Sequence, residues 1–190
     1  MREFRQMNLD EQGKTELRLI ARNTLESYLK DGTSPELRPT NSMLLEHAGA
    51  FVSLHEGEDL RGCIGQIVPD RELYKIVQSC ALNAALHDPR FSPLTAQQVP
   101  LVDIEISVLT PMVQVTRIEE IEVGRHGLYI TNGYQRGLLL PQVATQYGWG
   151  REAFLAQTCR KAGLPENAWR DPATSILSFE AQVFSETESH

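Results

Sequence analysis

Alternation of apolar and polar side chains is clearest in three segments of the first half of the chain. Residues 50–55 (AFVSLH) and 60–67 (LRGCIGQI) each have the pattern of a strand, and the polar EGED between them is typical of a turn. Residues 102–109 alternate Val and Ile with polar residues, which predicts a strand buried on one face. We therefore expect an antiparallel hairpin, followed later in the chain by a half-buried strand.

Apolar residues three or four positions apart predict three amphipathic helices, over residues 9–32, 71–88 and 151–164. The first should end at Asp31-Gly32, because glycine readily adopts the left-handed conformation that follows many helix termini.

The remaining patterned segments lie in the second half. Residues 121–148 predict two short strands joined by a turn around TNGYQRG, with a loop longer than two residues although Asn132-Gly133 is a favoured hairpin dipeptide. Residues 175–184 predict one closing strand. With no linker or repeat, residues 1–190 are expected to form a single domain. Its class is α+β, a mostly antiparallel sheet with flanking helices.

Composition narrows the class of function. The 41% hydrophobic and 23% charged residues are ordinary for a soluble globular protein, and no apolar run reaches the roughly 18–20 residues that cross a membrane. The first residues are polar, so we expect a cytoplasmic protein without a signal peptide. A net charge of −7 argues against DNA and other sequence-independent nucleic-acid binding, although it permits a local basic patch.

The three cysteines differ in their surroundings. Cys80 and Cys159 lie on apolar helix stripes, as buried small residues do. The odd number does not suit a disulfide framework, and the chain has no CxxC and no Cys/His cluster with the spacing of zinc ligands. We therefore expect no metal, and because phosphate-binding loops are also missing, no cofactor.

Cys63 stands between two glycines in LRGCIGQI. On a strand, Arg61, Cys63 and Gly65 would share one face, with Arg61 roughly 7 Å from Cys63. A guanidinium at that distance favours the thiolate, the nucleophilic form of cysteine. Two interpretations remain open: Gly62 and Gly65 clear space for a ligand, or they permit a bulge or the approach of another backbone.

A nucleophilic cysteine also needs a base, and the spacing of the histidines identifies none. His55 would lie near Leu60 if the EGED turn is tight, and His87 ends the second helix beside Asp88. In DPRF, Arg90 either reaches an anionic ligand, caps a helix terminus through its carbonyls, or forms an ion pair with Asp88. Glu105 shares a strand face with Asp103 and, if that strand is central, needs a partner such as Arg61 or Arg90.

The chain resembles the AMMECR family, the A component of the AmmeMemoRadiSam system. The resemblance covers about residues 10–184 and rests on six segments in order: LRGCIGQI, HDPRF, DIEISVLTP, VGRHGLYI, GLLLPQVA and the CRKAGL helix. It implies an α+β protein of two lobes around a cleft, and a genomic association with Memo-like and radical SAM proteins. It implies no reaction. The family's LRGCIG motif, regarded as its functional centre, is carried over intact onto Leu60, Arg61, Gly62, Cys63, Ile64 and Gly65.

Two functions are therefore expected as alternatives. In the first, a small anionic ligand or substrate binds around Arg61 and Cys63, with Arg90, Glu105 and His126 as further candidates; Cys63 attacks, contacts or senses it. In the second, the chain is a binding module for one of the associated proteins or for RNA. The loop residues that favour the second are Tyr134, Arg136, Tyr147 and Trp149.

Overall fold

The computed structural model describes residues 8–187, which form two compact units. The motif unit comprises residues 8–109 and 182–187 and contains LRGCIG; the hairpin unit comprises Thr110–Ala181. Both combine helices with an antiparallel sheet, so the α+β class is confirmed.

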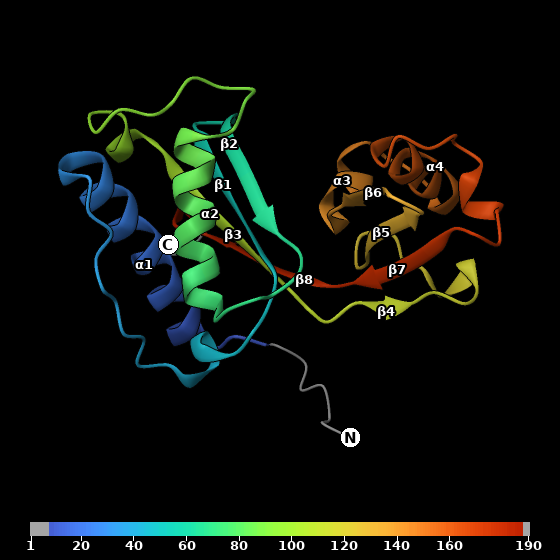
Figure 1. Cartoon of the computed structure of the whole chain (residues 1–190), viewed down its shortest axis with the longest axis horizontal. Helices are drawn as coiled ribbons and strands as arrows, with labels where there is room; N and C mark the ends of the chain where they lie inside the picture. Colours follow the sequence, from blue (N-terminus) through green and yellow to red (C-terminus); the bar gives the residue numbers. More distant parts are fainter. Residues whose placement is uncertain (1–7, 188–190) are drawn as a thin grey trace. The chain divides into compact units, whose positions relative to one another are not determined.

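Two helices cover one face of the sheet in the motif unit (Figure 1). Helix α1 (Glu11–Asp31) begins at Asp10, whose side chain accepts the Gly13 N–H, and ends as predicted at Gly32, which has φ 72°. Helix α2 (Leu73–Leu86) buries an apolar stripe against the sheet. These helices and the inward face of the sheet form one apolar core.

The sheet of the motif unit has the order β2-β1-β3-β8, so β2 is an outer strand. Its members are β1 (Ala50–Glu56), β2 (Asp59–Gln66), β3 (Asp103–Leu109) and β8 (Ala181–Ser185). Strands β1 and β2 form the predicted hairpin, joined by a two-residue loop in which Gly57 has φ 63°. Strand β3 is the predicted half-buried strand and pairs antiparallel with β1.

The hairpin unit has a second sheet of order β4-β7-β5-β6. Its strands are β4 (Val113–Gln114), β5 (Gly127–Asn132), β6 (Gln135–Leu139) and β7 (Ser175–Phe179). Helices α3 (Pro141–Gln146) and α4 (Arg151–Lys161) belong to the same unit. Buried side chains of these helices and of the sheet form an apolar core that is separate from the core of the motif unit.

Three expectations for this part of the chain are corrected. The β5–β6 loop has two residues, Gly133 and Tyr134, because Asn132 pairs directly with Gln135 and Gly133 adopts φ 59°. The segment 175–184 forms two strands in different sheets, β7 and β8, separated at Glu180. Residues 141–146 form the short helix α3, whereas two strands and no helix were predicted for residues 121–148. Pro141 stands at the first position of α3, where proline is a common helix-start signal.

Candidate functional site

The LRGCIG segment lies on the outer strand β2 and contains a bulge. From the hairpin loop, His55 pairs with Leu60 as expected, but Leu54 then pairs with Gly62, so Arg61 is one residue extra. Beyond the bulge, Ser53 faces Cys63. The bulge breaks the alternation that was expected to place Arg61 and Cys63 on one face.

The two glycines of the motif are explained by contacts with the protein itself. A Cβ on Gly62 would collide with the backbone carbonyl of Ala84 in α2, and a Cβ on Gly65 would enter the ring of Phe51. Gly62 therefore lets the helix approach the strand, while Gly65 makes room for an aromatic ring on the opposite face. The structure contains both features of the second interpretation, a bulge beside Gly62 and close approach of the protein's own atoms to the two glycines.

Asp88 connects the motif with the segment after α2. Its carboxylate is buried, with only 2% of the side chain exposed, and Oδ2 accepts the Cys63 N–H at 2.9 Å. The same carboxylate binds Arg90 in a bidentate manner, with Nε at 3.0 Å and Nη2 at 2.7 Å, and accepts the Arg90 backbone N–H at 3.1 Å. These hydrogen bonds from Arg90, above all, hold the pKa of Asp88 well below its usual range.

The Asp88–Arg90 pair also completes the outer edge of β2. Arg90 Nη2 lies 3.4 Å from the Cys63 carbonyl oxygen, so the pair provides both an acceptor and a donor to the backbone of Cys63. A neighbouring strand would supply these same two groups. Two side chains thus occupy the place of a strand at this position.

Arg61 reaches in the other direction. Both of its Nη atoms lie 3.3 Å from the carbonyl oxygen of Ser92. Arg61 thus crosses from the strand to the loop, while Arg90 crosses from the loop to the strand. The structure therefore brings two arginines to the same stretch of the β2 edge.

The thiol of Cys63 is half-buried and accepts a hydrogen bond from the Ser53 hydroxyl at 3.2 Å. Burial raises its pKa above the ordinary thiol value, and the negative charges of Asp88 and Glu105 act in the same direction. The Ser53 hydrogen bond and the charge of Arg90 only partly oppose this rise. The prediction of a thiolate favoured by Arg61 is therefore wrong in direction, because burial dominates and the bulge sends Arg61 to Ser92.

The other candidates occupy several positions. Glu105 lies opposite Ser53 on β3, in the same cross-strand row as Cys63. His55 Nε2 is buried and has no hydrogen-bond partner within residues 8–187. His87 Nδ1 lies 3.1 Å from Asn83 Oδ1. His126 belongs to the hairpin unit, where its Nδ1 accepts the Glu122 N–H at 3.0 Å.

The aromatic candidates for a binding module also lie in the hairpin unit. Tyr134 is fully exposed at the tip of the β5–β6 hairpin, and the exposed ring of Tyr147 stacks on Trp149 with 4.8 Å between centroids. Arg136 is exposed on β6.

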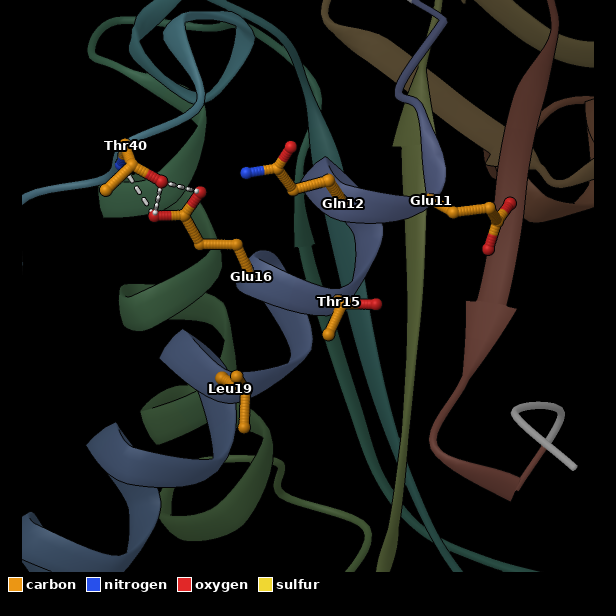
Figure 2. Close-up of a pocket in the computed structure, with 6 residues that line it drawn as sticks. All are labelled: Glu11, Gln12, Thr15, Glu16, Leu19 and Thr40. Carbon is orange, nitrogen blue, oxygen red and sulfur yellow. Dashed lines mark hydrogen bonds between the residues drawn. The ribbon is translucent and has the colours of Figure 1, made fainter.

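Two surface depressions lie elsewhere in the motif unit. Figure 2 shows one of about 530 Å³ along the first turns of α1, where the Glu16 carboxylate accepts hydrogen bonds from the backbone and hydroxyl of Thr40. Together with a bond from the Asn41 N–H, those bonds attach residues 40–41 to α1, so the Glu16 carboxylate is used in holding the fold. The second, of about 520 Å³, lies between residues 34–38 and α2.

Residues 8–187 contain no group of three or more His, Cys, Asp or Glu side chains placed to hold a metal ion. Within the same range, no helix has the length and apolar character needed to cross a membrane.

The fold is that of a known class of proteins. A sequence model of the AMMECR1 family matches residues 19–184, and the chain belongs to this family.

Phe51 and Ser53, which contact Gly65 and Cys63, were not predicted as site residues from the sequence. The hydrogen bond that Asp88 accepts from the Cys63 N–H was not predicted either.

Individual relatives are archaeal. A protein of Thermococcus gammatolerans is 41% identical over 190 residues, covering 93% of this chain and 91% of its own. Protein MJ0810 of Methanocaldococcus jannaschii is 41% identical over 176 residues, covering 88% and 87%. The crystal structure of uncharacterized protein PH0010 from Pyrococcus horikoshii is similar with a TM-score of 0.88 at 39% identity, covering 95% of this chain and 94% of that one.

Proposed function

We propose that the chain is a small-ligand-binding protein whose site, the β2 edge, takes a carboxylate or phosphate group. The observation that carries this proposal is the state of Arg90. Its guanidinium is held by a buried carboxylate, and yet 56% of its side chain is exposed. The hydrogen bonds of Arg90 to Asp88 and to the Cys63 carbonyl use Nε and Nη2, so within residues 8–187 its Nη1 still offers two N–H donors, held in place, to a carboxylate or phosphate oxygen.

Arg61 adds the charge that such a site needs. Because Asp88 offsets the charge of Arg90, a bound anion depends on a second cation close by. Arg61 reaches Ser92, two residues beyond Arg90, and its contacts at 3.3 Å are long for charged hydrogen bonds. An anion of higher charge density than a carbonyl oxygen would replace Ser92 as its partner.

In this proposal Cys63 contacts the ligand as a neutral thiol. Its pKa is raised, so nucleophilic attack would require a ligand that first lowers it. No reaction is assigned to the site.

Calorimetric titration with inorganic phosphate and with acetate, at low ionic strength, tests the proposal. Arg90→Gln should weaken phosphate binding about tenfold, the usual consequence of losing a charge-assisted contact. Arg61→Gln should also weaken it. Arg136→Gln, which changes an exposed arginine of the hairpin unit, is the matched control and should have no effect. Equal losses in all three variants, or no binding of either anion by the unaltered protein, would contradict the proposal.

A second candidate function is that of a binding module for a Memo-like or radical SAM protein. The exposed Tyr134 and the Tyr147–Trp149 stack favour it, since exposed aromatic side chains anchor many protein interfaces. Co-elution of such a protein with this chain, abolished in a Tyr134→Ala/Tyr147→Ala variant, is the expected result. Co-elution that survives both substitutions would remove this support.

A further inference from the structure

The ring of Phe51 lies flat on Gly65, the second glycine of LRGCIG. A Cβ built on Gly65 would come within 3.0 Å of three consecutive ring atoms, Cγ, Cδ1 and Cε1, at nearly equal distances. Such near-equality occurs when a point lies above the face of a ring; beside its edge, one atom would be much closer than the others. The ring therefore covers the backbone of Gly65 with one face.

This ring is on the same sheet face as the thiol. Phe51 pairs with Gly65 and Ser53 with Cys63, so the two pairs are successive rows on one side of the sheet, roughly 7 Å apart. Gly62, which packs on α2, faces the other side. Phe51 is only partly buried, whereas Val52 and Leu54 beside it are fully buried in the core. The ring thus keeps some accessible surface on the face that does not carry the helices.

Aromatic ring, neutral thiol and arginine follow one another along the strand. The accessible ring marks the Gly65 end, the thiol is one row further on, and Arg90 Nη2 reaches the Cys63 carbonyl. An apolar planar surface next to a fixed guanidinium is complementary to a ligand with the same two parts.

Building on the proposed function, we infer that the ligand is a planar, ring-bearing anion, an aromatic carboxylate or phosphate. Its ring stacks on Phe51 in the offset manner of aromatic pairs, with centroids about 4.5–7 Å apart. Its anionic group reaches Arg90 and Arg61, and Cys63 lies beneath the junction of ring and anion. Gly65 is required in this site because a side chain there would lift the ring of Phe51 from the strand.

Phenyl phosphate and inorganic phosphate are suitable probes, because they share the anion and differ in the ring. By calorimetry at matched ionic strength, the protein should bind phenyl phosphate at least fivefold more tightly. Phe51→Leu should reduce that preference to less than twofold while the affinity for inorganic phosphate is unchanged. Phe91→Leu is the matched variant: Phe91 stacks on Arg90, with 5.3 Å from the guanidinium carbon to the ring centroid, and its loss should preserve the preference.

A second measurement does not depend on any variant folding. In the unaltered protein, proton NMR should show nuclear Overhauser contacts between phenyl phosphate and the Phe51 ring. Phosphate binding that needs Arg90, but no preference for phenyl phosphate and no contact with Phe51, overturns the inference and leaves the proposed function standing. A preference lost in Phe91→Leu instead of Phe51→Leu also overturns it. Failure of both probes to bind overturns the inference and the proposed function together.

Discussion

At the scale of single residues, the chemistry of Cys63 is decided by burial. Half-buried beside Ser53, the thiol lies in a position where the charged form is poorly solvated. Arg90 and Ser53 favour the thiolate, but both act against a larger desolvation effect and two nearby carboxylates. The side chain is therefore a weak hydrogen-bonding group at neutral pH.

The pH dependence of iodoacetamide labelling, read by peptide mass spectrometry, should reflect this state. Because its pKa is raised, the labelling midpoint of Cys63 should lie above that of a free thiol, about 8.5. Ser53→Ala should raise the midpoint further, since the lost hydrogen bond favours the thiolate. Cys80, buried and with a pKa raised to about 12, is the internal control and should label more slowly. A Cys63 midpoint below 8.5 would contradict this account.

Asp88 should give the folded protein a defined dependence on pH. Its pKa is lower in the folded state, so its ionised form stabilises the fold above the unfolded value of about 4. That contribution is lost as the pH falls from there toward the folded-state pKa. At pH 7, Asp88→Asn should reduce the free energy of unfolding by about 2 kcal/mol.

Urea unfolding at pH 7 and pH 3 measures both effects, because the difference between Asp88→Asn and the unaltered protein should shrink at pH 3. Asp70→Asn is the control: Asp70 pairs with Arg71 but is 54% exposed, so its substitution should cost clearly less stability than that of Asp88. Equal losses from the two substitutions would be evidence against a special role for Asp88.

At the scale of elements, the outer strand β2 is protected by side chains. An outer strand presents unpaired backbone groups that can recruit another chain. At Cys63 those groups are bound by Asp88 and Arg90. The pair that pre-organises the proposed anion site therefore also blocks part of the edge.

Removing the pair should expose this edge to other molecules. An Asp88→Ala/Arg90→Ala variant should aggregate faster than the unaltered protein at 37 °C, as measured by light scattering. Asp70→Ala/Arg71→Ala removes an ion pair of the same composition from the surface and should leave the rate unchanged. Similar rates for the two double variants would show that the edge does not depend on Asp88 and Arg90.

A feature can be predicted from the sequence when the interactions that produce it join residues close together along the chain. Periodicity predicts α1, α2, α4 and the strands β1–β3 because each depends mostly on which of its own faces is buried. Counting back from the β1–β2 loop, however, would place Ser53 opposite Gly62, not Cys63. The glycines of LRGCIG indicate that a bulge is an option in this strand, but the local pattern does not place it at Arg61. The bonds of Asp88 to Cys63 join segments 25 residues apart.

At the scale of the whole molecule, the two units have separate apolar cores. One core joins the motif-unit helices and sheet, and the other lies within the hairpin unit. Charge is divided in the same way: residues 110–181 contain equal numbers of acidic and basic side chains, so the net charge of −7 belongs to the rest of the chain. Arg61 and Arg90 are thus a local basic site on the acidic unit.

Separate cores predict separate responses to a core substitution. Phe154, fully buried in the hairpin unit, can be changed to Leu at a cost of about 1.5 kcal/mol. Hydrogen exchange should then accelerate about tenfold in β5 and β6 while β1 and β2 keep their protection. Mass-spectrometric exchange on the intact chain measures this, and acceleration of equal size in both sheets would contradict it.

The bulge at Arg61 has a consequence for how this chain can change. If Arg61 paired with Leu54 in a regular ladder, Cys63 and Gly65 would turn inward to the helices and Ile64 would turn to the opposite face, because a shift of one residue exchanges the faces of a strand. The number of residues between the β1–β2 loop and Cys63 thus decides which face of the sheet each later residue of β2 occupies. Substitutions within this stretch leave those faces unchanged, and deletion of one residue can be absorbed by loss of the bulge. Insertion of a further residue would shift the register and exchange the faces, so added length is more damaging here than a change of composition.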